Sequence, residues 1–113
     1  MNGITTHVLD TSRGRPASGV PVVLEIRSGA EWWEIGRGET DSDGRVRQLL
    51  PDRSLLSAGT YRLTFNVGKY FESRGVESFY PEASIVFVIR DAAQHYHVPL
   101  LLSPYGYSTY RGS

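Results

Sequence analysis

The chain has 113 residues, with 12 Lys and Arg residues against 12 Asp and Glu residues, and it contains no Cys. This length supports one modest hydrophobic core, so we expect a single domain spanning residues 1–113. The balanced charge argues against a protein that binds nucleic acid through its phosphates. The lack of Cys excludes disulfides, thiolate nucleophiles and thiolate-ligated zinc, and it fits a reducing compartment.

The first seven residues have neither the basic nor the apolar region of a secretion signal. No later stretch approaches the roughly 18 apolar residues of a membrane-spanning helix. We therefore expect a cytoplasmic protein without a membrane partner.

Short runs of β-branched and aromatic residues alternate with turn residues, which is typical of an all-β domain. Eight short strands suggest a sandwich of two sheets. The predicted strands are Ile4–Asp10, Val20–Ser28, Trp32–Glu39, Arg45–Leu49, Gly59–Asn66, Ala83–Arg90, His95–Ser103 and Tyr105–Arg111.

The breaks between these strands have chemical causes. Residues 13–16 (Arg-Gly-Arg-Pro) and 41–44 (Asp-Ser-Asp-Gly) are turn sequences, and the second predicts that a strand begins at Arg45. Residues 69–75 break the β pattern, and Gly75 can end a short helix of about two turns.

The predicted strand at residues 85–89 (Ile-Val-Phe-Val-Ile) has no polar alternation, so both of its faces should be covered. Two explanations remain open at this point. Either the strand is central and fully buried, or a second subunit covers the face that the partner sheet does not.

The period of two along a strand places His95 and His97 on one face, with Pro99 and Leu101. The opposite face is apolar or aromatic and should face the core; it consists of Tyr96, Val98, Leu100 and Leu102. A His-x-His pair can supply half of a zinc site, although no third ligand is defined here. Solvated histidines or a metal-free acid/base site are the favoured alternatives.

The same period places His7 with Leu9 on the outer face of the first strand, opposite Thr6, Val8 and Asp10. On the last strand, Ser108 and Tyr110 share a face with Gly112. A lone His on a strand is more often a surface residue than a catalyst, and the terminal aromatics could simply pack. A strand so close to a chain end nevertheless needs something to hold it, because termini usually fray.

Several segments together resemble the 5-hydroxyisourate hydrolases, the enzymatic branch of the transthyretin-like family. The similarity covers almost the whole chain, and the closing Tyr-Arg-Gly-Ser is its most diagnostic element, because hormone-carrying transthyretins lack it. The segments are residues 6–10, 14–17, 40–45, 79–82 and 95–113.

The resemblance implies a two-sheet sandwich with one short helix, assembled as a homotetramer with a channel between its dimers. It carries catalytic roles onto His7, Arg45 and His97, and substrate-binding roles onto His7, Arg45, Ser108, Tyr110 and Ser113. His95 is not among these residues. No metal or cofactor is required.

The implied reaction is the hydrolysis of 5-hydroxyisourate to 2-oxo-4-hydroxy-4-carboxy-5-ureidoimidazoline in urate degradation, a branch of purine metabolism. The alternative from another class is a carrier that binds a small aromatic ligand in the same channel. Three ionisable groups in one place argue against a carrier of largely apolar ligands. A sandwich that serves only as an interaction module is the third alternative.

Overall fold

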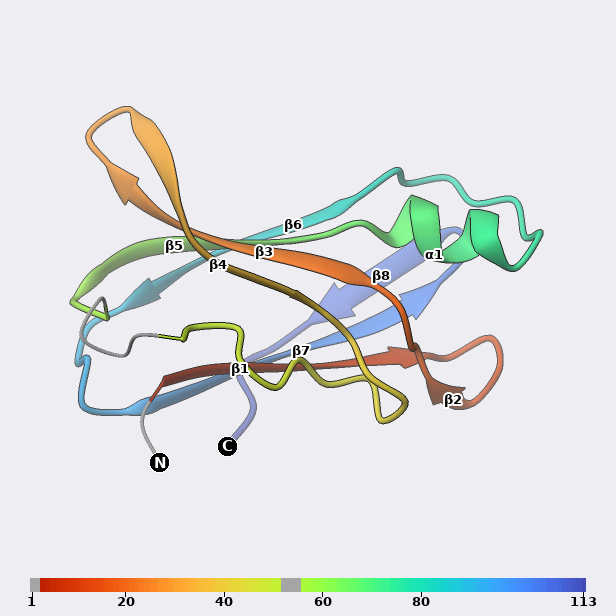
Figure 1. Ribbon diagram of the computed structural model, residues 1–113, viewed down its shortest axis with the longest axis horizontal. Helices are drawn as coiled ribbons and strands as arrows, with labels where there is room; N and C mark the ends of the chain where they lie inside the picture. Colours follow the sequence, from red (N-terminus) through yellow and green to blue (C-terminus); the bar gives the residue numbers. More distant parts are fainter. Residues whose placement is uncertain (1–2, 52–55) are drawn as a thin grey trace.

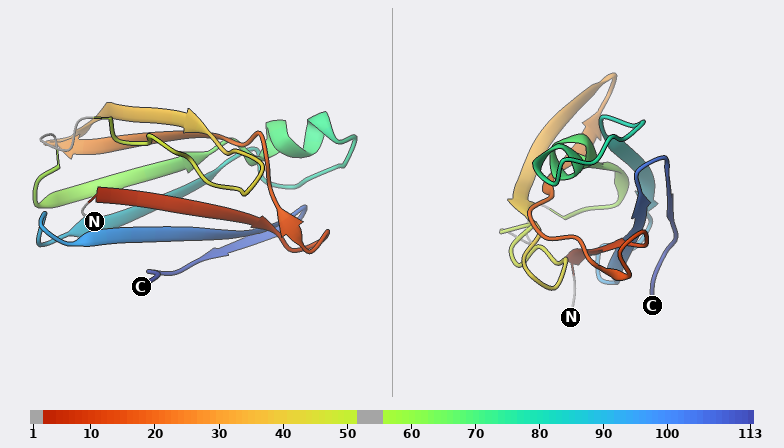
Figure 2. Two further views of the ribbon diagram at one scale, coloured as in Figure 1. Left: turned by 60° about the horizontal axis from the view of Figure 1, so that its bottom comes forward. Right: turned by 90° about the vertical axis from the view of Figure 1, so that its right-hand side faces the viewer.

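The computed structural model describes residues 3–51 and 56–113, which form two four-stranded sheets and one short helix (Figure 1). Figure 2 shows the sheets as two layers, with the helix at one end. The first sheet has the order β2 (Arg15–Pro16), β1 (Gly3–Asp10), β7 (His95–Ser103), β8 (Gly106–Thr109). The second has the order β4 (Glu31–Glu39), β3 (Pro21–Ser28), β5 (Gly59–Phe65), β6 (Ala83–Ile89). The predicted fold class, an eight-stranded sandwich with one short helix, is confirmed.

The core lies between the sheets and is built from alternate residues of each strand. The inner faces predicted for β1 and β7 are confirmed. Pro99 is buried as well, which the alternation did not predict. The largest fully buried side chains include Tyr61, Leu63 and Phe65 of β5, Leu24 of β3, Val8 of β1, and Leu100 and Leu102 of β7.

The first sheet is organised around a parallel pair, β1 and β7, which come from opposite ends of the sequence (Figure 1). In their register Thr5 lies opposite His97, and His7 lies opposite Pro99. Because side chains alternate between faces, the outer side chains of the two strands form one continuous surface.

The prediction of a strand at Arg45–Leu49 is wrong. Only Arg45 pairs, in an isolated antiparallel bridge with His7. Val46 and Leu49 are both buried, and their spacing of three does not fit the alternation of a strand. The segment instead passes so close to β4 that a Cβ on Gly36 would lie 1.8 Å from the Leu49 carbonyl oxygen.

Strand β6 lies at the edge of the second sheet, so the prediction of a fully buried central strand is also wrong. Val86 is 55% exposed and Val88 is 49% exposed. The second explanation for this apolar run, a covering subunit, stays a prediction.

Helix α1 (Val67–Ser73) begins two residues before the predicted segment. The Asn66 side chain accepts a hydrogen bond from the Lys69 backbone N–H at its start. Gly75 has a φ of 69° and follows its end, as predicted. Among the residues that the structure describes, no helix combines the length and apolar character needed to cross a membrane.

A buried carboxylate ties α1 to the first sheet. Asp10 accepts hydrogen bonds from the Tyr70 hydroxyl at 2.7 Å and from the Ser12 hydroxyl and backbone N–H. Burial raises the pKa of Asp10, but these hydrogen bonds to the charged form outweigh burial and leave the pKa below its ordinary value. The carboxylate therefore stabilises the fold above about pH 4, and this contribution is lost as the pH falls towards the lowered pKa.

We predict that Tyr70→Phe lowers the free energy of unfolding at pH 7 by about 1–3 kcal/mol, because one oxygen of the buried carboxylate loses its partner. The difference between variant and wild type should shrink as the pH falls below about 4. Urea denaturation at several pH values measures both effects. Tyr105→Phe is the control, since that hydroxyl donates a hydrogen bond to the exposed Glu77 at 3.4 Å; equal losses in both variants would contradict the prediction.

Candidate active site

The candidate site lies on the outer face of the first sheet, where β1 contributes His7 and β7 contributes His97. Both side chains are half-buried. His97 is two residues before Pro99, the residue opposite His7, so the two imidazoles are diagonal neighbours on one face. The sequence predicted this shared face, although it could not give the register.

Arg45 reaches this face from the turn at residues 41–44. The Asp41 carboxylate accepts hydrogen bonds from the backbone N–H groups of Asp43 and Arg45, at 2.9 and 3.1 Å. Gly44 completes the turn with a φ of 78°, and a Cβ there would lie 2.4 Å from the Val8 carbonyl oxygen. Only glycine fits this position, and the turn places Arg45 in its bridge with His7.

The electrostatics of His97 reflect this gathering of charges. Burial lowers its pKa below the ordinary value of 6.5, and charge repulsion with Arg45, His7 and His95 lowers it further. A hydrogen bond to the Thr5 backbone acts in the opposite direction without outweighing them. His97 is therefore largely neutral at pH 7, and His7 and Arg45 are near enough to affect its charge.

Sequence reasoning missed Thr5. Its Oγ1 lies 2.8 Å from His97 Nδ1 and 2.9 Å from His95 Nε2. The only signal in the sequence was that Thr5 shares a face with His7. Its contact with the histidines depends on the register of two strands about 90 residues apart, which periodicity does not reveal.

The C-terminal segment is held against β7 beside His97. Strand β8 ends at Thr109, two residues before the predicted end, and the chain pairs again through a hydrogen bond from the Gly112 N–H to the His97 carbonyl at 2.8 Å. A Cβ on Gly112 would lie 2.6 Å from His97 Cδ2. Arg111 stacks on the Tyr96 ring at 4.4 Å, which further fixes this end.

The other predicted site residues are less closely gathered. Ser108, on β8, pairs with Leu101 of β7. Ser113 is exposed. Tyr110 is 58% exposed and borders a mainly apolar cavity of about 320 Å³ between β6 and the β7–β8 pair. Within residues 3–51 and 56–113, no hydrogen bond joins these three residues to His7 or His97.

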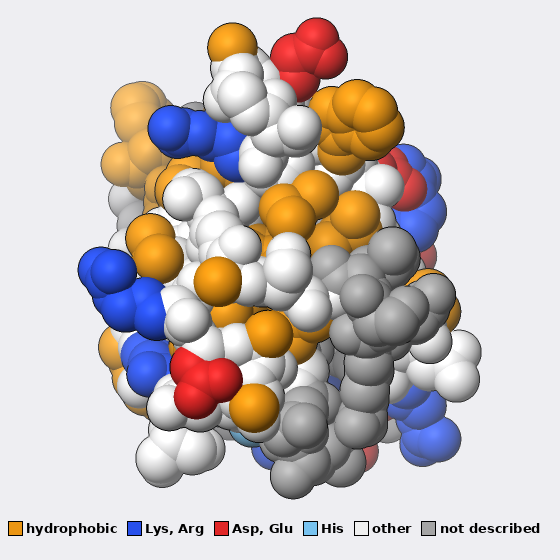
Figure 3. Space-filling view, turned by 90° about the vertical axis from the view of Figure 1, so that its left-hand side faces the viewer, with side chains coloured by type: hydrophobic (Ala, Val, Ile, Leu, Met, Phe, Trp, Pro, Cys, Tyr) orange, Lys and Arg blue, Asp and Glu red, His pale blue; other side chains and the backbone are white. Residues whose placement is uncertain are grey.

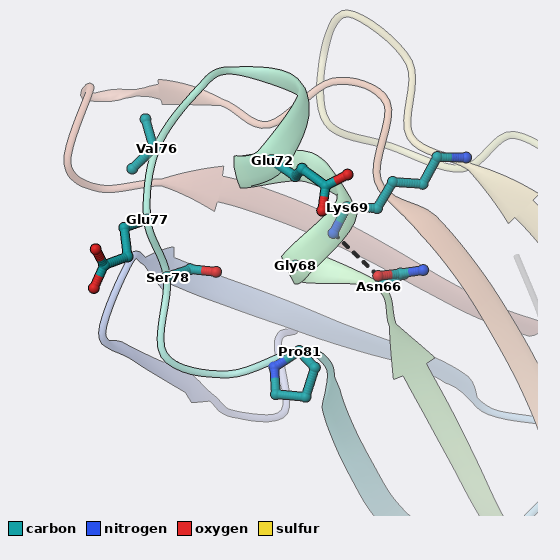
Figure 4. A pocket seen from close by; sticks show the side chains of 8 residues that line it. All are labelled: Asn66, Gly68, Lys69, Glu72, Val76, Glu77, Ser78 and Pro81. Atoms are coloured by element: carbon teal, nitrogen blue, oxygen red, sulfur yellow. Dashed lines mark hydrogen bonds between the residues drawn. The ribbon is translucent and has the colours of Figure 1, made fainter.

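Two hollows elsewhere on the surface contain none of the predicted site residues. One, of about 730 Å³, lies between α1 and residues 76–81 (Figure 4). The other, of about 300 Å³, lies at the β3–β4 hairpin beside the exposed Trp33, at the end of the molecule where Figure 3 shows hydrophobic side chains on the surface. Neither brings together an imidazole and a guanidinium.

The fold and the site together define a class: a small two-sheet sandwich that presents two imidazoles and a guanidinium on one sheet face. The chain belongs to the HIUase/Transthyretin family, which matches residues 4–112. The family resemblance noted from the sequence is confirmed.

Curated relatives are similar over nearly all of the chain. A probable 5-hydroxyisourate hydrolase of Caenorhabditis elegans is 53% identical, with 97% of this chain and 81% of that protein covered. The 5-hydroxyisourate hydrolase of Mus musculus is 46% identical, with 97% of this chain and 94% of that protein covered.

Solved structures of both branches share the fold. The 5-hydroxyisourate hydrolase of Klebsiella pneumoniae has a TM-score of 0.84 at 39% identity, with 97% of this chain and 98% of that chain covered. Transthyretin from Sparus aurata has a TM-score of 0.93 at 29% identity, with 99% and 97% covered. Because both superpose well, the backbone does not distinguish the branches, and the side chains must.

We predict that Arg45→Gln raises the pKa of His97 towards 6.5, because it removes one of the positive charges that lower this pKa. Proton NMR titration of the histidine ring signals measures the shift. Arg47→Gln is the matched control, since the Arg47 side chain is 90% exposed and its carboxylate partner is Asp41. A His97 titration that is the same in both variants would show that Arg45 does not act on it.

Proposed function

We propose that the chain hydrolyses 5-hydroxyisourate to 2-oxo-4-hydroxy-4-carboxy-5-ureidoimidazoline, a step in urate degradation. The observation that carries this proposal is the gathering of His7, Arg45 and His97 on one sheet face. The relatives described above support it, since those of the hydrolase branch are 39–53% identical over almost the whole chain.

The chemistry sets three requirements. Water must lose a proton as its oxygen bonds to the acyl carbon, the resulting oxyanion needs a positive partner, and the ring nitrogen must gain a proton as the carbon–nitrogen bond breaks. Two imidazoles and one guanidinium can meet these requirements without a metal.

Arg45 binds the carbonyl-rich substrate and its developing oxyanion. Its planar fork of N–H donors suits two oxygen acceptors better than a Lys ammonium group would. The Arg45 side chain is exposed in the single chain, while its backbone is fixed by Asp41 and by the bridge to His7. The backbone of Arg45 is thus fixed beside His7, and its charge acts on His97.

His7 and His97 orient water and transfer protons. His97 is suited to this because its lowered pKa keeps the imidazole uncharged near neutral pH. Tyr110, Ser108 and Ser113 complete the substrate-binding site by positioning; the family resemblance and their place on or beside the β8 edge support these roles.

The site also suggests an assembly. We propose a homotetramer in the cytoplasm, in which subunits join through the edge strands β6 and β8 and the outer faces of the first sheets line a channel. The exposed valines of β6 and the apolar cavity beside Tyr110 support this assembly. Covering apolar surface of this kind with a second chain stabilises the assembled state.

A carrier of a small aromatic ligand is the second candidate. The observation in its favour is the TM-score of 0.93 to a transthyretin. The cluster of three ionisable groups disfavours it, because transport of an apolar ligand does not require them.

We predict that the wild type accelerates the decay of freshly generated 5-hydroxyisourate, followed by ultraviolet absorbance. His7→Ala and His97→Ala should each lower the rate by about 10²–10⁴, as loss of a positioned acid or base does. Arg45→Ala should cost about 3–4 kcal/mol of transition-state stabilisation. All three should still fold, since the three side chains lie outside the hydrophobic core between the sheets.

Arg47→Ala is the control for these variants and should retain full activity. A wild type that leaves the spontaneous decay unchanged but binds an aromatic ligand would favour the carrier. A wild type that does neither would favour an interaction module.

We predict that light scattering gives the mass of four 12.6 kDa chains for the wild type. Val86→Lys places a charge on the exposed edge of β6 and should lower this mass. Val76→Lys alters a comparably exposed valine beside α1, at 40% exposure, and should leave the mass unchanged. A monomeric wild type would contradict the proposed assembly.

A further inference from the structure

A threonine hydroxyl joins the two histidines of β7. Thr5 Oγ1 is within hydrogen-bond distance of both His95 Nε2, at 2.9 Å, and His97 Nδ1, at 2.8 Å. The parallel register places Thr5 opposite His97, with Gly3 opposite His95, so no side chain of β1 separates the hydroxyl from either ring. His95, Thr5 and His97 therefore form a continuous chain of hydrogen bonds that ends at the proposed active-site imidazole.

Counting protons limits this chain to three arrangements, because a hydroxyl has one proton to donate. In the first, His95 Nε2–H donates to Thr5, and Thr5 donates to His97 Nδ1. In the second, both directions are reversed. In the third, both rings donate to Thr5. The arrangement decides which nitrogen of His97 carries its proton, and hence what the ring offers to a substrate.

Burial of His95 distinguishes the arrangements. Its Nδ1 atom is buried and has no hydrogen-bond partner among residues 3–51 and 56–113. In the second arrangement a neutral His95 carries its proton on Nδ1, which leaves a buried N–H without an acceptor. The first leaves only a lone pair unused, and unsatisfied buried N–H groups are the rarer of the two. The third gives the Thr5 proton no acceptor within the described residues.

We infer that His95 and Thr5 hold His97 in the tautomer that carries its proton on Nε2. Nδ1 then accepts the hydrogen bond from the Thr5 hydroxyl, and Nε2 is left as a donor. Both residues are positioning residues, since they act through His97. The lowered pKa of His97 agrees with this assignment, because only a neutral imidazole has two tautomers.

This inference rests on the proposed function, and it divides the work between the two histidines. His97 Nε2–H donates a hydrogen bond to the carbonyl oxygen as it becomes an oxyanion, beside Arg45. His7 takes the proton from water as the carbon–oxygen bond forms and passes it to the ring nitrogen as the carbon–nitrogen bond breaks. The proton count closes without a proton leaving His97, because the proton that His7 takes from water is the one that the ring nitrogen receives.

The direct test measures the tautomer. In protein labelled with ¹⁵N-histidine, the ring nitrogen shifts distinguish a protonated from an unprotonated position, and loss of signals in His97→Gln assigns them. We expect protonated Nε2 and unprotonated Nδ1 in the wild type and in Thr5→Ser, and a mixture of tautomers in Thr5→Val. Protonated Nδ1 on His97 in the wild type would overturn the inference.

Kinetics provide the second test. Thr5→Val should lower kcat about tenfold with little change in KM, as expected for the loss of one orienting hydrogen bond, and Thr5→Ser should restore it. His95→Leu should resemble Thr5→Val, whereas His95→Gln retains an N–H donor towards Thr5 and should keep most of the activity. Full activity in both Thr5→Val and His95→Leu would overturn the inference.

The two histidine variants keep the inference testable if Thr5→Val does not fold. A wild type without hydrolase activity would refute the proposed function while the NMR measurement still reports the tautomer. An active wild type with the opposite tautomer would refute the inference alone.

Discussion

The parallel pairing of β1 with β7 is the constraint on which the candidate site depends. It sets Thr5 against His97 and places His7 one step along the same face, so that three groups from opposite ends of the sequence meet. A shift by one residue would turn the β1 side chains to the other face, moving His7 towards the core and Val8 towards the outer surface. The buried apolar residues on the inner face therefore fix the register, and the register fixes the site.

Much of the fold followed from the sequence, because strand alternation and turn residues are local properties. The faces of His7 and His97 and the turn before Arg45 are examples. The segment after Arg45 was mistaken for a strand because Val46 and Leu49 are buried by the close approach of glycines on β4, a contact between distant parts of the chain. Thr5 was missed for the same reason. Ser108, Tyr110 and Ser113 stay predictions, since one chain does not bring them to the histidines.

Glycines make room for the imidazoles. Gly44 lies beside the His7 ring and Gly112 beside the His97 ring, and a Cβ at either position would come within 3.2 Å of ring carbon Cδ2 or nearer. The Gly of the terminal Tyr-Arg-Gly-Ser thus has a steric role next to a proposed catalytic group. Since the backbone matches structures of both family branches, local packing of this kind and the ionisable side chains are what give the site its chemistry.

The distance along the sequence between Thr5 and His97, 92 residues, also affects how the protein acquires its site during folding. Closing so large a loop has a high entropic cost, and contacts between remote segments slow folding. The strand pairs of the second sheet join segments that lie nearer to each other in the sequence, whereas β1 cannot pair until β7 is available. On a ribosome the two strands cannot meet until β7 has emerged, so hydrolytic activity would appear only after that point in synthesis.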